Sequence, residues 1–248
     1  MSRRLPGGLR AALAATGLSL VVLNSFRAPA SELPPTIAQY SNAVEQVLNS
    51  KERQSLQPVF ELAIQNSPGL QAILPSLSPA ELEALKPKSK GLIVNRENPT
   101  YVRPSADYFN DLAKSKGTKA DRAFFEIYAR TEPDKNAIYP AYIRQQPSNT
   151  GGCTIFDGPL LIELYRAWLG FRTTYPDDYA TEAQGELDSM NAELQAGTCA
   201  CGSQNEVTAA LTGFVKAFPD LPIAPKLRER IDRVKAGTSH IRYHCHGG

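Results

Sequence analysis

Three segments of this chain repeat one pattern: FEIYARTEPD (125–134), WLGFRTTYPD (168–177) and LTGFVKAFPD (211–220). Each has a large apolar residue eight positions before a proline and an aromatic residue five positions before it. The apolar residues are Phe125, Trp168 and Leu211, and the aromatic residues are Tyr128, Phe171 and Phe214. Because positions three apart share one face of a helix, the pattern predicts three helices with a buried apolar face.

The Pro-Asp pair that closes each segment predicts the end of that helix. Proline lacks an N–H and restricts the residue before it, so the helices should end near Pro133, Pro176 and Pro219. The aspartate that follows can cap the next helix. The interval of 43 residues is the same both times, which indicates stacked antiparallel helical hairpins. The pattern resembles an α-solenoid unit, although its period does not match the tetratricopeptide length.

The rest of the chain also has mainly helical patterns, so we predict a mainly all-α fold. Helical spacing extends over residues 36–52 and 57–66. Residues 78–85 begin with a serine cap followed by proline, and residues 105–117 end on a glycine. Strand-like patterns occur only near residues 91–104, which we predict to form a small β-hairpin.

We divide the chain into three regions. Residues 1–30 are a cleavable export signal, residues 31–117 an N-terminal helical region, and residues 118–248 a disulfide-stapled region of helical hairpins. The second boundary falls where Thr118 caps a helix that has Asp121 in its first turn. The last two regions can also form one continuous domain.

The export signal is predicted from three features. A basic start at residues 3–10 precedes an apolar core at residues 11–23, and the motif APA at residues 28–30 is a small-x-small cleavage site. The apolar core is too short to span a bilayer, which needs about 20 residues, and no longer apolar run follows. We therefore expect a periplasmic or secreted protein with no membrane span after cleavage.

The charge balance gives no electrostatic signature of nucleic-acid binding. The chain has 27 basic and 25 acidic residues, and the first 30 residues contain four of the basic residues and no acidic one. The remainder has 23 basic against 25 acidic residues, a net charge of −2. No nucleic-acid partner is expected. Short basic stretches such as LKPKSKG (85–91) are typical of a solvated loop.

Four cysteines, Cys153, Cys199, Cys201 and Cys245, favour two disulfide bonds in an exported chain. In the hairpin scheme all four lie at the end of the stack opposite the Pro-Asp turns. A Cys199–Cys201 bridge would close a very small ring. We therefore expect one of these two to pair with Cys153 and the other with Cys245. Thiol–disulfide exchange at Cys199-x-Cys201 is the alternative role, although no Cys-x-x-Cys accompanies it.

The three histidines, His240, His244 and His246, lie within the last ten residues beside Cys245. Copper and zinc accept these ligand types, and His240 and His244 are spaced to share one helix face. A metal-binding protein is therefore one alternative. The spacing is unlike known zinc pairs, so we expect polar surface histidines, with no metal or other cofactor.

No sequence motif names a reaction, since G-x-S-x-G, H-E-x-x-H and phosphate-binding glycine loops are all missing. We expect a binding or scaffold module of the periplasm or cell envelope with a protein or peptide partner. The other alternative is an envelope hydrolase that uses a carboxylate pair from Asp157, Glu163 and Glu126. Aromatic residues that could line its groove are Tyr101, Tyr108, Phe109, Tyr139 and Tyr142.

Overall fold

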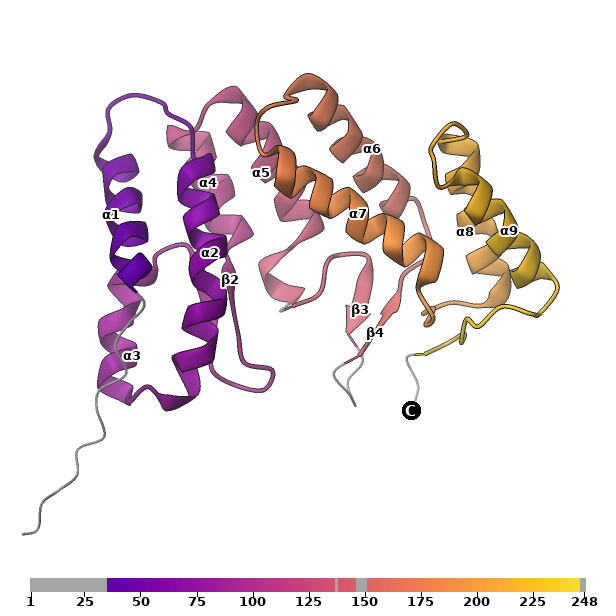
Figure 1. Ribbon diagram of the computed structural model, residues 1–248, viewed down its shortest axis with the longest axis horizontal. Coiled ribbons are helices and arrows are strands. Elements are labelled where there is room, and N and C mark those ends of the chain that lie inside the picture. Colours follow the sequence, from indigo (N-terminus) through magenta and orange to yellow (C-terminus); the bar gives the residue numbers. More distant parts are fainter. Residues whose placement is uncertain (1–34, 137, 146–150, 246–248) are drawn as a thin grey trace, which may run out of the picture. The chain divides into compact units, whose positions relative to one another are not determined.

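The computed structural model describes residues 35–136, 138–145 and 151–245; the predicted export signal lies outside this part. Residues 31–248 form one compact unit that is mainly helical, as predicted (Figure 1). The helices are α1 (Pro35–Asn49), α2 (Gln57–Ile73), α3 (Pro79–Leu85), α4 (Ala106–Lys116), α5 (Lys119–Thr131), α6 (Leu160–Thr174), α7 (Ala180–Ala196), α8 (Gln204–Ala217) and α9 (Ala224–Lys235), with 3-10 turns η1 (Leu74–Ser76), η2 (Lys86–Ser89) and η3 (Asp134–Asn136). The strands are β1 (Leu92–Asn95), β2 (Tyr101–Pro104), β3 (Ile143–Gln145) and β4 (Gly152–Thr154). They form two small antiparallel β-ladders: β1–β2 is the hairpin predicted near residues 91–104, and β3–β4 was not predicted.

The repeated turns end their helices as predicted. Helices α5, α6 and α8 each stop two residues before a proline of the repeat. The residue before each proline has nearly the same conformation, with φ between −119° and −137° and ψ between 60° and 68°. Its N–H donates to the carbonyl oxygen of the repeated aromatic residue, at 2.7 Å for Tyr128, 2.8 Å for Phe171 and 2.9 Å for Phe214. The three copies therefore share a local structure as well as a sequence pattern.

The segments that follow the turns differ between the copies. Helices α6 and α7 form an antiparallel hairpin, and so do α8 and α9 (Figure 1). After Pro133 the described chain forms the short turn η3 and then β3, so the first copy lacks a second helix there. Helix α5 packs instead against α4 and α6.

The prediction that the repeated aspartate caps the next helix is wrong. Asp134 caps α4, because its Oδ2 accepts from Ser105 Oγ at 2.5 Å and its Oδ1 accepts from the N–H of Ala106 at 2.7 Å. The N-cap residues of α7 and α9 are Tyr179 and Ile223, and neither side chain makes a capping bond. These helices begin several residues after the aspartate, too late for its side chain to serve as the N-cap.

Helix α2 is longer than the sequence predicts. The predicted range, 57–66, stops before Pro68, but the helix continues through this proline to Ile73. Leu70 and Leu74, beyond the proline, are fully buried. Burial of their side chains outweighs the single helical hydrogen bond that proline removes.

One hydrophobic cluster extends from Ile37 to Ile241. The repeated residues Trp168, Phe171, Leu211 and Phe214 are all buried in it, as predicted. The indole N–H of Trp168 donates to Oγ1 of the buried Thr131 at 3.0 Å. The indole ring also packs edge-on against Phe124, with 5.4 Å between the ring centroids. Trp168 therefore ties α6 to α5.

Replacing Trp168 by alanine should lower the free energy of unfolding by about 3–5 kcal/mol, because it opens a large cavity and leaves Thr131 without its donor. Urea denaturation followed by circular dichroism measures this loss. The control is Glu126→Ala, an exposed change on α5 that should shift stability by less than about 0.5 kcal/mol. Equal stabilities for the two variants would contradict the assigned role of Trp168.

Candidate binding site beside the disulfide-linked strands

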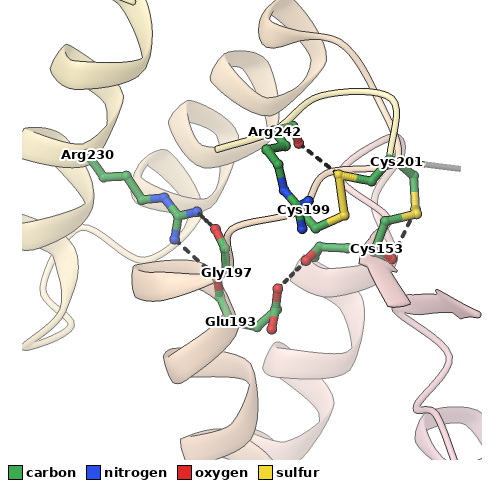
Figure 2. The surroundings of a disulfide bond; sticks show 9 residues. Cys153, Glu193, Gly197, Cys199, Cys201, Arg230 and Arg242 are labelled. Atoms are coloured by element: carbon green, nitrogen blue, oxygen red, sulfur yellow. Dashed lines mark hydrogen bonds between the residues drawn. A yellow bond between two sulfur atoms is a disulfide. The ribbon is translucent and has the colours of Figure 1, made fainter. Parts of the chain in front are cut away.

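The segment Thr198–Gly202 carries both middle cysteines and joins two distant parts of the chain (Figure 2). Cys201 is bonded to Cys153, and Cys199 is bonded to Cys245, with Cα–Cα distances of 5.0 Å and 5.9 Å. The sequence predicts that one of the two middle cysteines bonds to Cys153 and the other to Cys245, but it leaves open which one bonds to which partner. Both cysteines of the Cys-x-Cys pair thus bond to other partners, and the C-terminal segment is held through Cys245.

Backbone hydrogen bonds reinforce the disulfides on both sides of this segment. The N–H of Thr154 donates to the carbonyl of Cys199, and the N–H of Cys201 returns a bond to Thr154, each at 2.9 Å. On the other side, the N–H of Ala200 donates to the carbonyl of Arg242 at 2.9 Å, and the N–H of Arg242 donates to Thr198 at 2.8 Å. The segment is therefore paired in parallel with β4 on one side and with the C-terminal residues on the other.

Arg230 of α9 fixes the helix that leads into this segment. Its buried guanidinium donates to the carbonyl oxygens of Glu193 at 3.2 Å and Leu194 at 2.7 Å, and also to that of Gly197 (Figure 2). These carbonyls lie at the C-terminus of α7, where the helix dipole favours a cation. That of Glu193 also accepts from the N–H of Gly197 at 2.9 Å. Burial lowers the pKa of Arg230 from its ordinary value, although arginine remains charged.

A hollow of about 460 Å³ lies beside this segment, and a second hollow of about 630 Å³ adjoins it. Both are lined by Tyr139 and Ile143, so the two hollows meet at β3. The larger one is lined by three cationic residues, Arg130, Lys135 and Arg144, and its described lining contains no acidic residue.

The three cations are accessible to solvent. Lys135 and Arg144 are exposed. Arg130 forms an ion pair with Glu163 at 3.6 Å, with about half of each side chain exposed at 48% and 49%. Such an exposed pair is weak, so Arg130 can exchange this partner for another anion. Residues 146–150, which lie outside the described part, have the sequence QPSNT and add no charge to the region.

The carboxylates considered for a hydrolase do not form a buried pair. Asp157, Glu163 and Glu126 are all exposed, and Glu163 faces Arg130 rather than another acid. Of the five aromatic residues considered for a groove, Phe109 and Tyr142 are buried in the core. Tyr139 is the one that lines the hollows beside β3.

Sequence reasoning missed a different pair of acids, Glu132 and Glu186. Burial raises the pKa of Glu132 to about 7, although the positive charge of Arg103 acts to lower it. Burial, followed by the charge of Glu132, raises the pKa of Glu186 to about 8. Burial and these nearby glutamates also raise the pKa of Tyr128 and Tyr142 above the ordinary value, so both hydroxyls stay protonated.

One feature of the sequence could have drawn attention to this pair: Glu132 stands directly before Pro133, at the turn of the first repeat. Arg103 holds that turn by donating to the carbonyl oxygens of Glu132 at 3.3 Å and Pro133 at 2.9 Å. Neither Glu132 nor Glu186 lines the two hollows beside β3. The hydrolase hypothesis therefore stays a prediction.

The C-terminal histidines do not share a helix face. Helix α9 ends at Lys235, and the chain is extended where Arg242 pairs with Cys199. His240 and His244 are exposed, and His246 lies outside the described residues. Within residues 35–136, 138–145 and 151–245, no group of three histidine, cysteine or acidic residues is placed to hold a metal ion.

No protein-family model matches the chain, and comparisons with curated proteins and with solved structures also find no match. None of the helices in the described part combines the length and apolar character that crossing a bilayer requires.

The disulfide pairing can be checked with single cysteine variants alkylated under denaturing, non-reducing conditions. In Cys245→Ser we expect one free thiol, located at Cys199 by mass spectrometry, and in Cys153→Ser one at Cys201. Each loss should destabilise the protein by about 3–4 kcal/mol, because a long loop is released in the unfolded chain. A free thiol at Cys201 in Cys245→Ser would contradict the pairing.

The partly buried acids Glu132 and Glu186 predict that stability falls as the pH rises from the ordinary glutamate pKa to about 7 to 8. Their folded-state pKa values are raised, so their contribution is complete below the ordinary glutamate pKa and is lost as both ionise. Glu186→Gln should therefore be more stable than the unchanged protein at pH 8.5, by roughly 1–2 kcal/mol. Urea denaturation at pH 6 and 8.5 measures this gain. The control Glu126→Gln should show the full pH dependence, and the same slope for Glu186→Gln would refute the prediction.

Proposed function

We propose that this chain is an exported binding module that holds an extended, acidic segment of a partner protein along strand β3. The observation that carries the proposal is the charge of the larger hollow beside β3. Arg130, Lys135 and Arg144 line it, with no acidic residue among its described lining, although residues 31–248 have a net charge of −2. Electrostatic complementarity of this kind attracts and orients an anionic partner.

An extended ligand suits the shape of this region. Because Tyr139 and Ile143 line both hollows, a ligand that follows β3 can contact the two in succession. The smaller hollow is lined by the small side chains of Ala192 and Ala196, which leave room for a peptide backbone. Its one acidic lining residue, Glu193, accepts a hydrogen bond from the hydroxyl of Thr154. Ile143 also gives the ligand an apolar contact between the charged positions.

The backbone of β3 can take part as well. In its antiparallel pairing with β4, Arg144 lies opposite Cys153, and Ile155 donates to the carbonyl of Tyr142 at 2.8 Å. Along such a ladder, residues whose backbone groups bond to the partner strand alternate with residues whose backbone groups point away from it. The Ile143 carbonyl and the Gln145 N–H therefore lie on the outer edge of β3. No described strand pairs with this edge. An extended peptide can add there as a further strand.

The proposed compartment is the periplasm or the extracellular space. The two disulfides join cysteines 48 and 46 residues apart, and structural bonds of this kind persist in oxidising environments. The basic, apolar and small-residue features of residues 1–30 support export.

Fluorescence anisotropy with a labelled peptide of alternating glutamate and valine tests the proposal. The peptide should bind, and the double change Lys135→Glu and Arg144→Glu should weaken binding at least about tenfold, or about 1.4 kcal/mol. Raising the salt concentration should also weaken binding, because the charges are exposed.

The control is Lys119→Glu, which reverses one charge on α5 at an exposed position, as each of the two substitutions in the double variant does. It lies 11 residues from Arg130, roughly 16 Å along the helix, and should leave the affinity unchanged. Equal binding of a lysine–valine peptide, or equal losses from the control and the double variant, would refute the proposal.

A further inference from the structure

A separate hollow of about 490 Å³ lies between the α3–η2 segment and β1. Four aliphatic side chains line it: Leu82, Leu85, Leu92 and Val94. Leu82 and Leu85 are three residues apart on α3, and Leu92 and Val94 are two apart on β1, so each pair presents one face. Leu85 is buried and the other three are partly exposed. The volume falls within the range of small-ligand sites.

Cationic residues surround this apolar lining. Lys86, Lys90 and Arg96 line the hollow, and Glu83 is the one acidic residue among its described lining. Glu83 pairs with Lys86 at 2.6 Å, but both side chains are about 70% exposed, so the pair is weak. Arg96 donates to the carbonyl oxygen of Pro75 at 3.0 Å, which holds it in place. In the described part of the chain, the Lys90 ammonium has no hydrogen-bond or ion-pair partner.

The backbone at this edge is held rigidly. Gly91 has a φ of +81°, and a Cβ at this position would lie 2.5 Å from a ring carbon of Tyr108. The hydroxyl of Tyr40 donates to the carbonyl oxygen of Lys90. The LKPKSKG stretch is therefore fixed against the core at its last two residues, unlike the freely solvated loop that its sequence suggests. A preformed site loses less conformational entropy when it binds a ligand.

We propose that this hollow binds a free medium-chain fatty acid, with its alkyl chain against the aliphatic residues and its carboxylate near Lys90 and Arg96. An aliphatic lining favours an alkyl chain, and the excess of positive charge at its edge favours an anionic head group. This site is distinct from the hollows beside β3, and none of the residues that line it also lines those hollows.

Isothermal titration calorimetry with butanoate, octanoate and decanoate, below their micelle concentrations, tests the proposal on the full exported chain. Each added methylene that enters the hollow should tighten binding about fourfold. Binding should saturate at one fatty acid per chain. Decyl maltoside has the same chain without the charge, and it should bind at least about tenfold more weakly than decanoate.

Three surface variants localise the site. Lys90→Gln should weaken decanoate binding about fivefold or more, whereas Lys88→Gln, an exposed change in η2 outside the lining, should not alter it. Glu83→Gln should tighten binding by a few-fold, because it removes the only acidic group of the described lining, and a misfolded protein cannot produce this gain. All three changes are at exposed positions, so circular dichroism should remain unchanged.

Some results would overturn the proposal. These are affinity that does not depend on chain length, equal effects of Lys90→Gln and Lys88→Gln, or unaltered binding in Glu83→Gln. Binding to phosphatidylglycerol vesicles without saturable decanoate binding would also overturn it, because the basic edge would then recognise a lipid surface instead of a free fatty acid.

Discussion

One buried carboxylate, that of Asp121, sets the relation between the two halves of the fold. It accepts hydrogen bonds from the N–H and hydroxyl of Thr118 at the start of α5, at 2.6 Å and 2.7 Å. It also accepts from the N–H of Leu56, just before α2, at 3.0 Å and from the hydroxyl of Tyr179, just before α7, at 2.5 Å. Burial and the nearby Asp121 charge raise the pKa of Tyr179, so this hydroxyl remains a donor. Tyr179 in turn stacks on Phe124, with 3.9 Å between ring centroids, and adopts the left-handed conformation that begins α7.

Short-range signals predict much of this fold, because their physical cause lies within a few residues. The repeated prolines end α5, α6 and α8, and the side-chain caps that begin α3 and α5 form as the sequence indicates. The position of the four cysteines at one end of the hairpins could also be predicted, because it follows from the order of helices and loops along the chain. Asp121 could be recognised as part of a cap, but its bonds to Leu56 and Tyr179 cross 65 and 58 residues and leave no local pattern.

The features that sequence reasoning missed depend on long-range packing. Strands β3 and β4 have three residues each, too few to show a periodic pattern, and they persist because Thr154 pairs with the segment that carries Cys199. Helix α2 continues past Pro68 because the core accepts the side chains beyond it. Glu132 and Glu186 are 54 positions apart in the chain, so the effect of the Glu132 charge on the pKa of Glu186 appears only in the folded state. The hollow beside β3 likewise collects its cations from α5, η3 and β3.

The Cys-x-Cys segment has a consequence for oxidative folding. The native loops span 48 and 46 residues, and exchanging Cys199 with Cys201 would give loops of nearly the same length. Loop-closure entropy varies only with the logarithm of length, so an unfolded chain scarcely distinguishes correct from scrambled pairing. A slip of two residues would also keep every side chain of the segment on its own face. The correct isomer must then be selected by the backbone bonds of Thr154 and Arg242, so native pairing follows folding of the helices, and early oxidation requires later disulfide reshuffling.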